Sequence, residues 1–178
     1  MGKLFSTNNA DIFIKEVAPN LPFKCTNWLL ERGFFTAPAS TKYHGSHEGG
    51  LFQHSFSVMK TLVDLTMRNN LKWERPESPY IVGIFHDLCK IDSYYSEDYG
   101  QTFSYNTDTL LKGHGEKSVM LLSTLGQLTE EEVVCIRYHM GAFTDKEQWS
   151  DYTRAIHHYP NVLWTHTADM ITTHILIK

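Results

Sequence analysis

The spacing of apolar residues along the first seventy positions is that of amphipathic helices interrupted by one loop. The patterns over 9–18 and 26–32 predict two short helices, the second ended by Gly33. The stretch 37–50 is rich in Pro, Ser and Gly, as loops are. Over 51–69, apolar residues recur at core-facing helical intervals, so we expect one long helix there.

The middle of the chain contains two further helical patterns. Ser78 followed by Pro79 predicts an N-cap and a first helical position, and this helix would carry the adjacent pair His86 and Asp87. A second helix is expected from about 115 to 126, where a glycine stands at each end.

Capping residues also mark the helices of the last fifty positions. Thr129 and Glu132 have the spacing of a capping box, which predicts a helix that carries His139 and ends at Gly141. Two more helices follow from their expected N-caps. Asp151 would begin one that ends before Pro160, and Asn161 would begin one that carries Asp169.

The segment 92–108 departs from the helical pattern. Its tyrosines and the turn around Tyr99 and Gly100 predict a small β-hairpin or an ordered loop. The expected fold is therefore an all-α helical bundle with one aromatic excursion. No repeat or linker divides the chain, so we expect a single domain over 1–178, in which helices of 1–40 pack on a core at about 43–175.

Composition narrows the classes of function. Hydrophobic residues make up 42% and charged residues 20%, and the net charge is −4 with neutral histidines. This balance is globular, and it argues against strong binding of duplex nucleic acid, while small nucleotides and short single strands remain open as partners. The oligomeric state does not follow from the sequence.

Cysteine usage and the N-terminal segment bear on location. The three cysteines, Cys25, Cys89 and Cys135, are odd in number and form no C-x-x-C pair, so neither a disulfide framework nor a zinc knuckle is expected. The chain shows no apolar signal-peptide core and no stretch long enough to span a membrane. A reducing cytoplasm fits best, with Cys89 a small buried apolar residue.

Imidazoles and carboxylates recur along the predicted helices in a way that suggests a metal site. The candidate ligands are His54, His86, Asp87, His114, His139 and Asp169. Such side chains bind divalent cations through nitrogen and oxygen. Asp87 has two oxygens and can bridge two ions, the first completed by His54 and Asp169, the second by His114 and His139. Since ten histidines are present, His47, His157, His158 and His174 are read as non-ligands.

Two ions that share a bridge are a recurrent device for hydrolysing phosphate esters, with a metal-bridging hydroxide as nucleophile. The ligand chemistry fits Mn, Fe, Co, Ni, Zn or Mg and does not choose among them. The sequence thus predicts two divalent metal ions as cofactors.

Several motifs around these residues resemble those of a known family. They are GGLFQHS at 49–55, IFHDLCK at 84–90, GHGEKS at 113–118, IRYHMG at 136–141 and HTADM at 166–170. Together, over about 43–175, they resemble the HD-domain metal-dependent phosphohydrolases. The HDxxK form is similar to the binuclear branch, including the HD module of certain bacterial 3′-5′ exoribonucleases. The resemblance implies an all-helical fold and metal-ligand roles for the candidate ligands named above.

The chain also departs from parts of that family. Lys90 stands where mononuclear nucleotidases of the superfamily often have glutamate, and the GYP motif is absent, which makes cyclic-di-GMP an unexpected substrate. The residues before about 43 show no pattern of an oligonucleotide-binding barrel, so we expect the resemblance to the exoribonucleases to cover only their catalytic part.

Other residues near the motifs are candidates for binding or positioning. Asp87 and Lys90 are the expected catalytic residues; Lys90 lies four positions after His86 on the same helix face, where it can contact a phosphate or orient Asp87. His166 can orient Asp169 or pack in the core. The candidates for substrate binding are His44, Lys117, Arg137, Tyr94 and Tyr95.

For most of these residues a structural role is an open alternative. The tyrosines of 92–108 can stack a nucleobase or can simply pack the hairpin onto the helices. The expected activity is hydrolysis of a phosphodiester or phosphomonoester in a nucleotide or short oligonucleotide, and the two extra histidines and Lys90 favour a diester. The alternative is a non-catalytic metal- and nucleotide-binding sensor or scaffold of the same fold.

Overall fold

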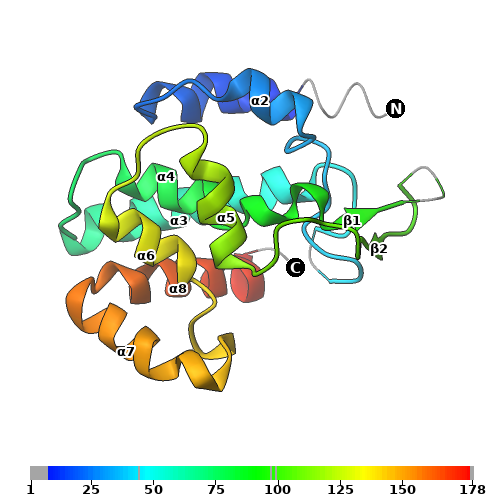
Figure 1. Ribbon diagram of the computed structural model, residues 1–178. Coiled ribbons are helices and arrows are strands. Elements are labelled where there is room, and N and C mark those ends of the chain that lie inside the picture. The colour runs from blue at the N-terminus through cyan, green and yellow to red at the C-terminus, as the bar shows by residue number, and fades with distance from the viewer. Residues whose placement is uncertain (1–7, 44, 97, 99, 177–178) are drawn as a thin grey trace.

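The computed structural model describes residues 8–43, 45–96, 98 and 100–176 and has an all-α architecture with one small antiparallel sheet (Figure 1). The α-helices are α2 (Thr26–Glu31), α3 (Gly50–Asn69), α4 (Ser78–Phe85), α5 (Gly115–Ser123), α6 (Glu130–Arg137), α7 (Trp149–His158) and α8 (Asn161–Ile171). The all-α prediction is confirmed, and the long predicted helix over 51–69 corresponds to α3.

Shorter elements connect and extend these helices. The 3₁₀ segments are η2 (Ala18–Asn20), η3 (Leu88–Asp92), η4 (Gly141–Phe143) and η5 (Lys146–Gln148), and the π-helical segments are η1 (Phe13–Val17) and η6 (Thr172–Leu176). The helix predicted over 9–18 is therefore α-helical only at 8–12 and continues as η1 and η2. Similarly, α5 ends at Ser123, before Gly126.

Helices α3 and α4 form the centre of the bundle, and α8 and α6 pack beside them (Figure 1). The close approach of α3 and α4 depends on Gly83, because a Cβ atom built at this position would lie 2.5 Å from Met59 Cα. The two helices therefore meet at backbone distance. This contact places His54 of α3 next to His86, which follows the last residue of α4.

The core is largely aromatic where the N-terminal segment meets the bundle. Fully buried phenylalanines from that segment and from the central helices pack edge to face, as in Phe13 against Phe35, whose ring centroids lie 5.5 Å apart. Phe34 contacts Phe52 of α3 and Phe85 of α4. Burial of these rings attaches the segment before residue 40 to the helices that carry the site.

The capping box at the start of α6 is confirmed, since Thr129 accepts from the Glu132 backbone N–H and Glu132 accepts from the Thr129 backbone N–H. The predicted cap at Ser78 is wrong. Ser78 is the first residue of α4, and its hydroxyl donates to Glu132 Oε1 at 2.8 Å. A buried carboxylate thus uses the hydroxyl that would otherwise cap the helix.

Two other predicted N-caps are also wrong. Helix α7 begins at Trp149, so Asp151 lies within its first turn. Asn161 is the first residue of α8, and its amide donates to the Lys72 carbonyl at 2.7 Å and to Glu131 Oε1 at 2.8 Å. For Asp151, the helix begins earlier than expected. For Asn161, partners that are distant in sequence take the amide that was expected to cap the helix.

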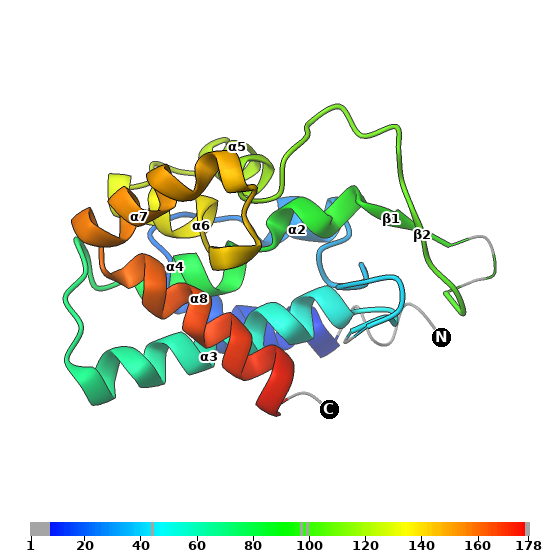
Figure 2. The same cartoon turned by 90° about the horizontal axis from the view of Figure 1, so that it is seen from below.

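The hairpin predicted within 92–108 is confirmed. Strands β1 (Tyr94–Tyr95) and β2 (Ser104–Tyr105) pair antiparallel, with Tyr94 opposite Tyr105. The hairpin extends away from the helices at one end of the bundle (Figure 2). Of the predicted turn, Gly100 has a positive φ, and Tyr99 lies outside the described residues.

The three cysteines are free and buried, whereas a disulfide framework would have paired them; none was expected from the sequence. Within the described part of the chain, no helix combines the length and apolar character needed to cross a membrane.

Candidate metal centre

All of the predicted ligand residues lie together, although they come from separate segments. His54 belongs to α3 and Asp169 to α8, whereas His114 immediately precedes α5. The prediction that helices carry the other ligands is wrong. Helix α4 ends at Phe85 and α6 at Arg137, so His86, Asp87 and His139 lie in the turns that follow.

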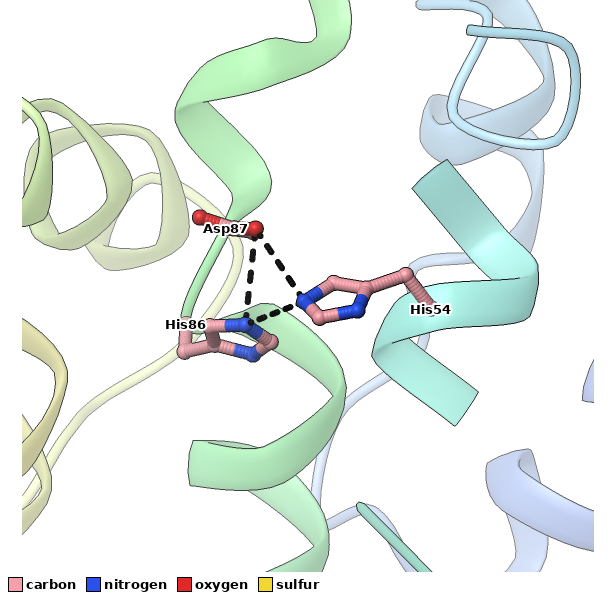
Figure 3. A group of neighbouring side chains, drawn as sticks. All are labelled: His54, His86 and Asp87. Atoms are coloured by element: carbon pink, nitrogen blue, oxygen red, sulfur yellow. Dashed lines mark hydrogen bonds and ion pairs between the residues drawn. The ribbon is translucent and has the colours of Figure 1, made fainter. Parts of the chain in front are cut away.

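The first group of contacts surrounds Asp87 Oδ2 (Figure 3). His54 Nε2 and His86 Nε2 lie 3.3 Å from each other, and each lies 3.5 Å from this oxygen. Asp169 Oδ1 lies 3.3 Å from the same nitrogen of His54. Two imidazoles and two carboxylates thus point toward a common position.

The other oxygen of Asp87 faces a second group. His114 Nε2 lies 2.8 Å and His139 Nε2 lies 3.6 Å from Asp87 Oδ1. The ring of His139 lies between the two groups, with centroids 4.9 Å from His86 and 5.0 Å from His114. Asp87 therefore has one oxygen directed to each group, which is the arrangement that a bridging ligand needs.

Backbone carbonyls fix the orientation of two of these rings. His86 Nδ1 donates to the Gly83 carbonyl at 2.9 Å, and His139 Nδ1 donates to the Ile136 carbonyl at 2.7 Å. In each neutral ring the proton is then on Nδ1, so Nε2 presents its lone pair to the cluster. Metal-ligating histidines are held in this way.

The interior of the cluster is rich in acceptors. Among the described residues, neither the buried Asp87 Oδ1 nor the buried His139 Nε2 has a hydrogen-bond partner of acceptable geometry. Buried acceptors of this kind are costly unless a cation or a proton lies between them. The donor set is therefore one that fits a divalent cation, and these buried groups can hold a metal ion.

Neighbouring charges keep Asp87 ionised. Burial alone would raise the pKa of Asp87, but the charges of Lys90 and His86 outweigh it and hold that pKa well below its usual range. Lys90 Nζ lies 2.7 Å from Asp87 Oδ2. Lys90 belongs to η3, so the expectation that it shares a helix face with His86 is wrong. The expected roles of Lys90 were to contact a phosphate or to orient Asp87, and the contact with Asp87 is present in the structure.

The imidazoles differ in their electrostatic surroundings. Burial lowers the pKa of His139, and the nearby charges of His86 and His114 lower it further. For His114, burial also opposes protonation, but the carboxylate of Asp87, whose Oδ1 lies 2.8 Å from His114 Nε2, raises the pKa of His114 to about 10. Of these two rings, His139 is thus the one more readily available as a neutral ligand.

Cys89 has a contact that the sequence did not indicate. It is buried, as expected, but its Sγ lies 3.2 Å from His114 Nδ1. Its backbone N–H donates to Ser118 Oγ, which ties η3 to α5. His114 is therefore oriented by a thiol, whereas the other two rings are oriented by carbonyls. No local pattern marks this pair, because the two residues are far apart in sequence.

His166 positions the backbone of His139 rather than the carboxylate of Asp169. Its Nδ1 lies 2.9 Å from the His139 carbonyl oxygen. The ring packs against Gly141, which has φ +59°, and a Cβ atom at that glycine would lie 2.6 Å from the ring. His166 therefore supports the turn after α6, in place of the expected orientation of Asp169.

Two of the predicted phosphate-binding cations are engaged elsewhere. Lys117 is buried and pairs with Asp92, and it is not among the described residues that line the cavity over the metal centre. Arg137 pairs with Glu116 at 3.1 Å and lies over the ring of Tyr138 at 4.6 Å. It borders a neighbouring cavity of about 250 Å³.

A cavity of about 680 Å³ opens directly over the metal centre. Its wall includes Tyr94 of the predicted pair, while Tyr95 is not among the described residues that line it. His44 lies outside the described residues. Sequence analysis did not single out several wall residues, because only tertiary packing brings them to the cavity: Tyr43, Met140, Phe143, Met170, Thr173 and His174.

Comparisons of this chain with protein-family models, with curated proteins and with solved structures give no match. The class of site is thus defined by its geometry alone: it is a buried group of imidazoles and carboxylates that can hold a metal ion beneath a cavity.

Proposed function

We propose that this protein is a metal-dependent phosphohydrolase of the HD-domain type, which cleaves a phosphodiester or phosphomonoester in a nucleotide or short oligonucleotide. One observation carries the proposal: the two oxygens of Asp87 face two groups of imidazoles at the base of an accessible cavity. Paired carboxylate and imidazole sites of this kind suit phosphate chemistry better than they suit a purely structural ion.

The proposed ligand sets share Asp87. His54, His86 and Asp169 would hold one cation with it, and His114 and His139 would hold another. Divalent cations held by these residues would supply Lewis acidity and a nucleophilic water near neutral pH. Nitrogen and oxygen ligands are compatible with Mn, Fe, Co, Ni, Zn or Mg.

The residues of the chain itself have separate tasks in this scheme. Asp87 stays ionised and joins the ligand groups, while the ammonium of Lys90 fixes its orientation and adds positive charge at the cavity wall. That charge favours the approach of a phosphate group to the metal centre. The carbonyls of Gly83 and Ile136 keep two of the rings aimed inward, so little reorganisation is needed.

The motifs at 49–55, 84–90, 113–118, 136–141 and 166–170, which resemble those of HD-domain enzymes, support the same proposal. Three free, buried cysteines are compatible with action in a reducing cytoplasm.

Metal analysis combined with an activity screen tests the proposal. Purified protein is analysed for bound metal, then loaded with Mn²⁺, Co²⁺ or Ni²⁺ and assayed on bis-p-nitrophenyl phosphate, p-nitrophenyl phosphate and a nucleotide panel. We expect metal-dependent release of product that excess chelator abolishes. Bound metal and nucleotide without turnover would indicate the sensor or scaffold instead. Absence of metal binding would exclude both.

A further inference from the structure

Exposed aromatic side chains gather around the cavity over the metal centre. Tyr43 is 80% exposed, Tyr105 is 68% exposed and Phe143 is 69% exposed, and all three line this cavity. They come from the loop before α3, from β2 and from η4. Convergence of exposed rings from unrelated segments on one cavity is more than scattered surface hydrophobicity.

Packing of the hairpin accounts for only part of this arrangement. The rings of Tyr94 and Tyr105 contact each other, with centroids 5.3 Å apart, and Tyr94 is half-buried by its surroundings. The outer ring, Tyr105, keeps most of its surface accessible, as does Phe143. Aromatic surface that stays open toward a cavity is available to stack on a planar ligand.

We propose that the cavity binds a single nucleoside phosphate, with its phosphate at the Asp87 and Lys90 end and its base against the aromatic wall that Tyr105 and Phe143 provide. The phosphate end rests on the proposed function, whereas the base end rests on the exposed rings alone. A volume of about 680 Å³ lies well within the range of pockets that enclose ligands of this size.

The charges around the cavity favour one nucleotide over a strand. Grooves that follow single strands are lined by a run of cations. Among the described residues that line the cavity, Lys90 is the only lysine or arginine, and it contacts Asp87. In the neighbouring cavity Arg137 is paired with Glu116, and Asp145 also lines the wall. A second phosphate group would therefore find little positive charge.

Equilibrium binding of matched probes tests the proposal without relying on turnover. The probes are a phosphonate analogue of adenosine 5′-monophosphate and the same phosphonate on a ribose without a base. Binding is measured by calorimetry with Mn²⁺ and by ligand-observed NMR in excess chelator. Because stacking of one base on aromatic side chains has a known size, we expect the base to tighten binding about 5- to 100-fold in both conditions.

Surface substitutions locate the base. Tyr105→Ala and Phe143→Ala should each remove much of the preference for the probe with a base and leave binding of the ribose phosphonate unchanged. Tyr105→Phe should retain the preference. Tyr95→Ala is the matched control, since Tyr95 is an exposed tyrosine of the same hairpin that is not among the described residues lining the cavity. All of these positions are exposed, so the variants should fold.

The outcomes separate this proposal from the proposed function. Equal binding of both probes, equal loss in Tyr95→Ala, or much tighter and steeply salt-dependent binding of a pentanucleotide would overturn it. If p-nitrophenyl esters are cleaved but the base has no effect, only the nucleotide proposal fails. If the base effect holds and no ester is cleaved, only the hydrolase proposal fails.

Discussion

Two buried polar clusters lie between helices of this bundle, one around Asp87 and one around Glu132. Glu132 is surrounded by donors: Arg75 donates to both of its oxygens at 2.7 Å, Ser78 donates at 2.8 Å, and the Thr129 backbone N–H donates at 2.9 Å. Asp87 receives one close ammonium on Oδ2, but its other oxygen faces imidazole nitrogens without a hydrogen bond of acceptable geometry.

The difference shows how a structural carboxylate is distinguished from a ligand. Both side chains are almost fully buried, so burial and charge do not separate them. The partners do. A carboxylate whose lone pairs are all met by donors is complete in the folded chain. A carboxylate whose oxygen faces imidazole nitrogens without such a bond needs a cation or a proton between them.

The largest expected effect comes from Asp87→Ala, which removes the carboxylate common to both ligand groups. We expect loss of bound metal and a fall in hydrolysis of more than about 100-fold, because changes even to residues behind metal ligands cost 10- to 100-fold. Metal analysis and a chelator-controlled ester assay measure this. Asp92→Asn is the control, as Asp92 pairs with Lys117 outside the cluster. Turnover retained in Asp87→Ala would exclude a bridging role.

Glu132→Ala should test the other cluster, with an effect on stability rather than on metal. Removing one partner of a buried pair typically costs 3–5 kcal/mol. Since the Arg75 side chain keeps 25% of its surface exposed, we expect about 3 kcal/mol, the low end of that range. Urea denaturation measures the change, and the metal content per folded chain should not alter. A variant that folds normally but loses metal would contradict the division between the clusters.

Cys89→Ala should give a smaller and more specific change at the metal centre. It removes the thiol that contacts His114 Nδ1, so His114 loses its orienting partner. We expect the affinity for one of the two proposed ions to fall about 10-fold, the low end for such supporting contacts. Metal titration followed by calorimetry measures it. Cys89→Ser, which keeps a polar atom at this place, should fall less; equal losses in both variants would point to packing alone.

The smallest expected effect is that of Thr129→Ala, which removes one half of the capping box of α6. Loss of an N-cap side chain costs about 1 kcal/mol. The second half, the bond from the Thr129 backbone N–H to Glu132, can persist. Thermal denaturation should show a modest decrease in stability with unchanged metal content. Thr129→Ser should restore the wild-type value, and a failure to do so would argue against the cap as the cause.

The parts of the fold that were predicted correctly depend on residues close in sequence. The capping box joins Thr129 to a residue three positions later, and the hairpin pairs Tyr94 with Tyr105 within a single short segment of the chain. Such signals are local, so the sequence alone displays them. The all-α class follows from the same kind of local periodicity.

Several expectations that the structure does not match concern side chains whose partners are distant in sequence. Ser78 and Asn161 have the right type for N-caps, but buried glutamates of α6 take their hydrogen bonds. Lys117 is one helical turn from His114, yet packing of α5 on η3 turns it to Asp92. Only tertiary contacts decide such cases.

The candidate ligands were identified by residue type and order, and their grouping in space was an expectation that packing had to provide. The sequence could not show which group orients each imidazole ring. The carbonyl that orients His139 and the thiol that orients His114 are brought into contact only by the geometry of the turns.

The contact between α3 and α4 at Gly83 has a consequence for tolerance to substitution. A methyl group there would act as a wedge against Met59 and force the helix axes apart. His54 lies on α3 and His86 directly follows α4, so separation of the two helices would increase the distance between the Nε2 atoms of these rings. A position that contributes no side chain to the site, only the carbonyl that orients His86, thus limits how closely the ligand groups approach one another.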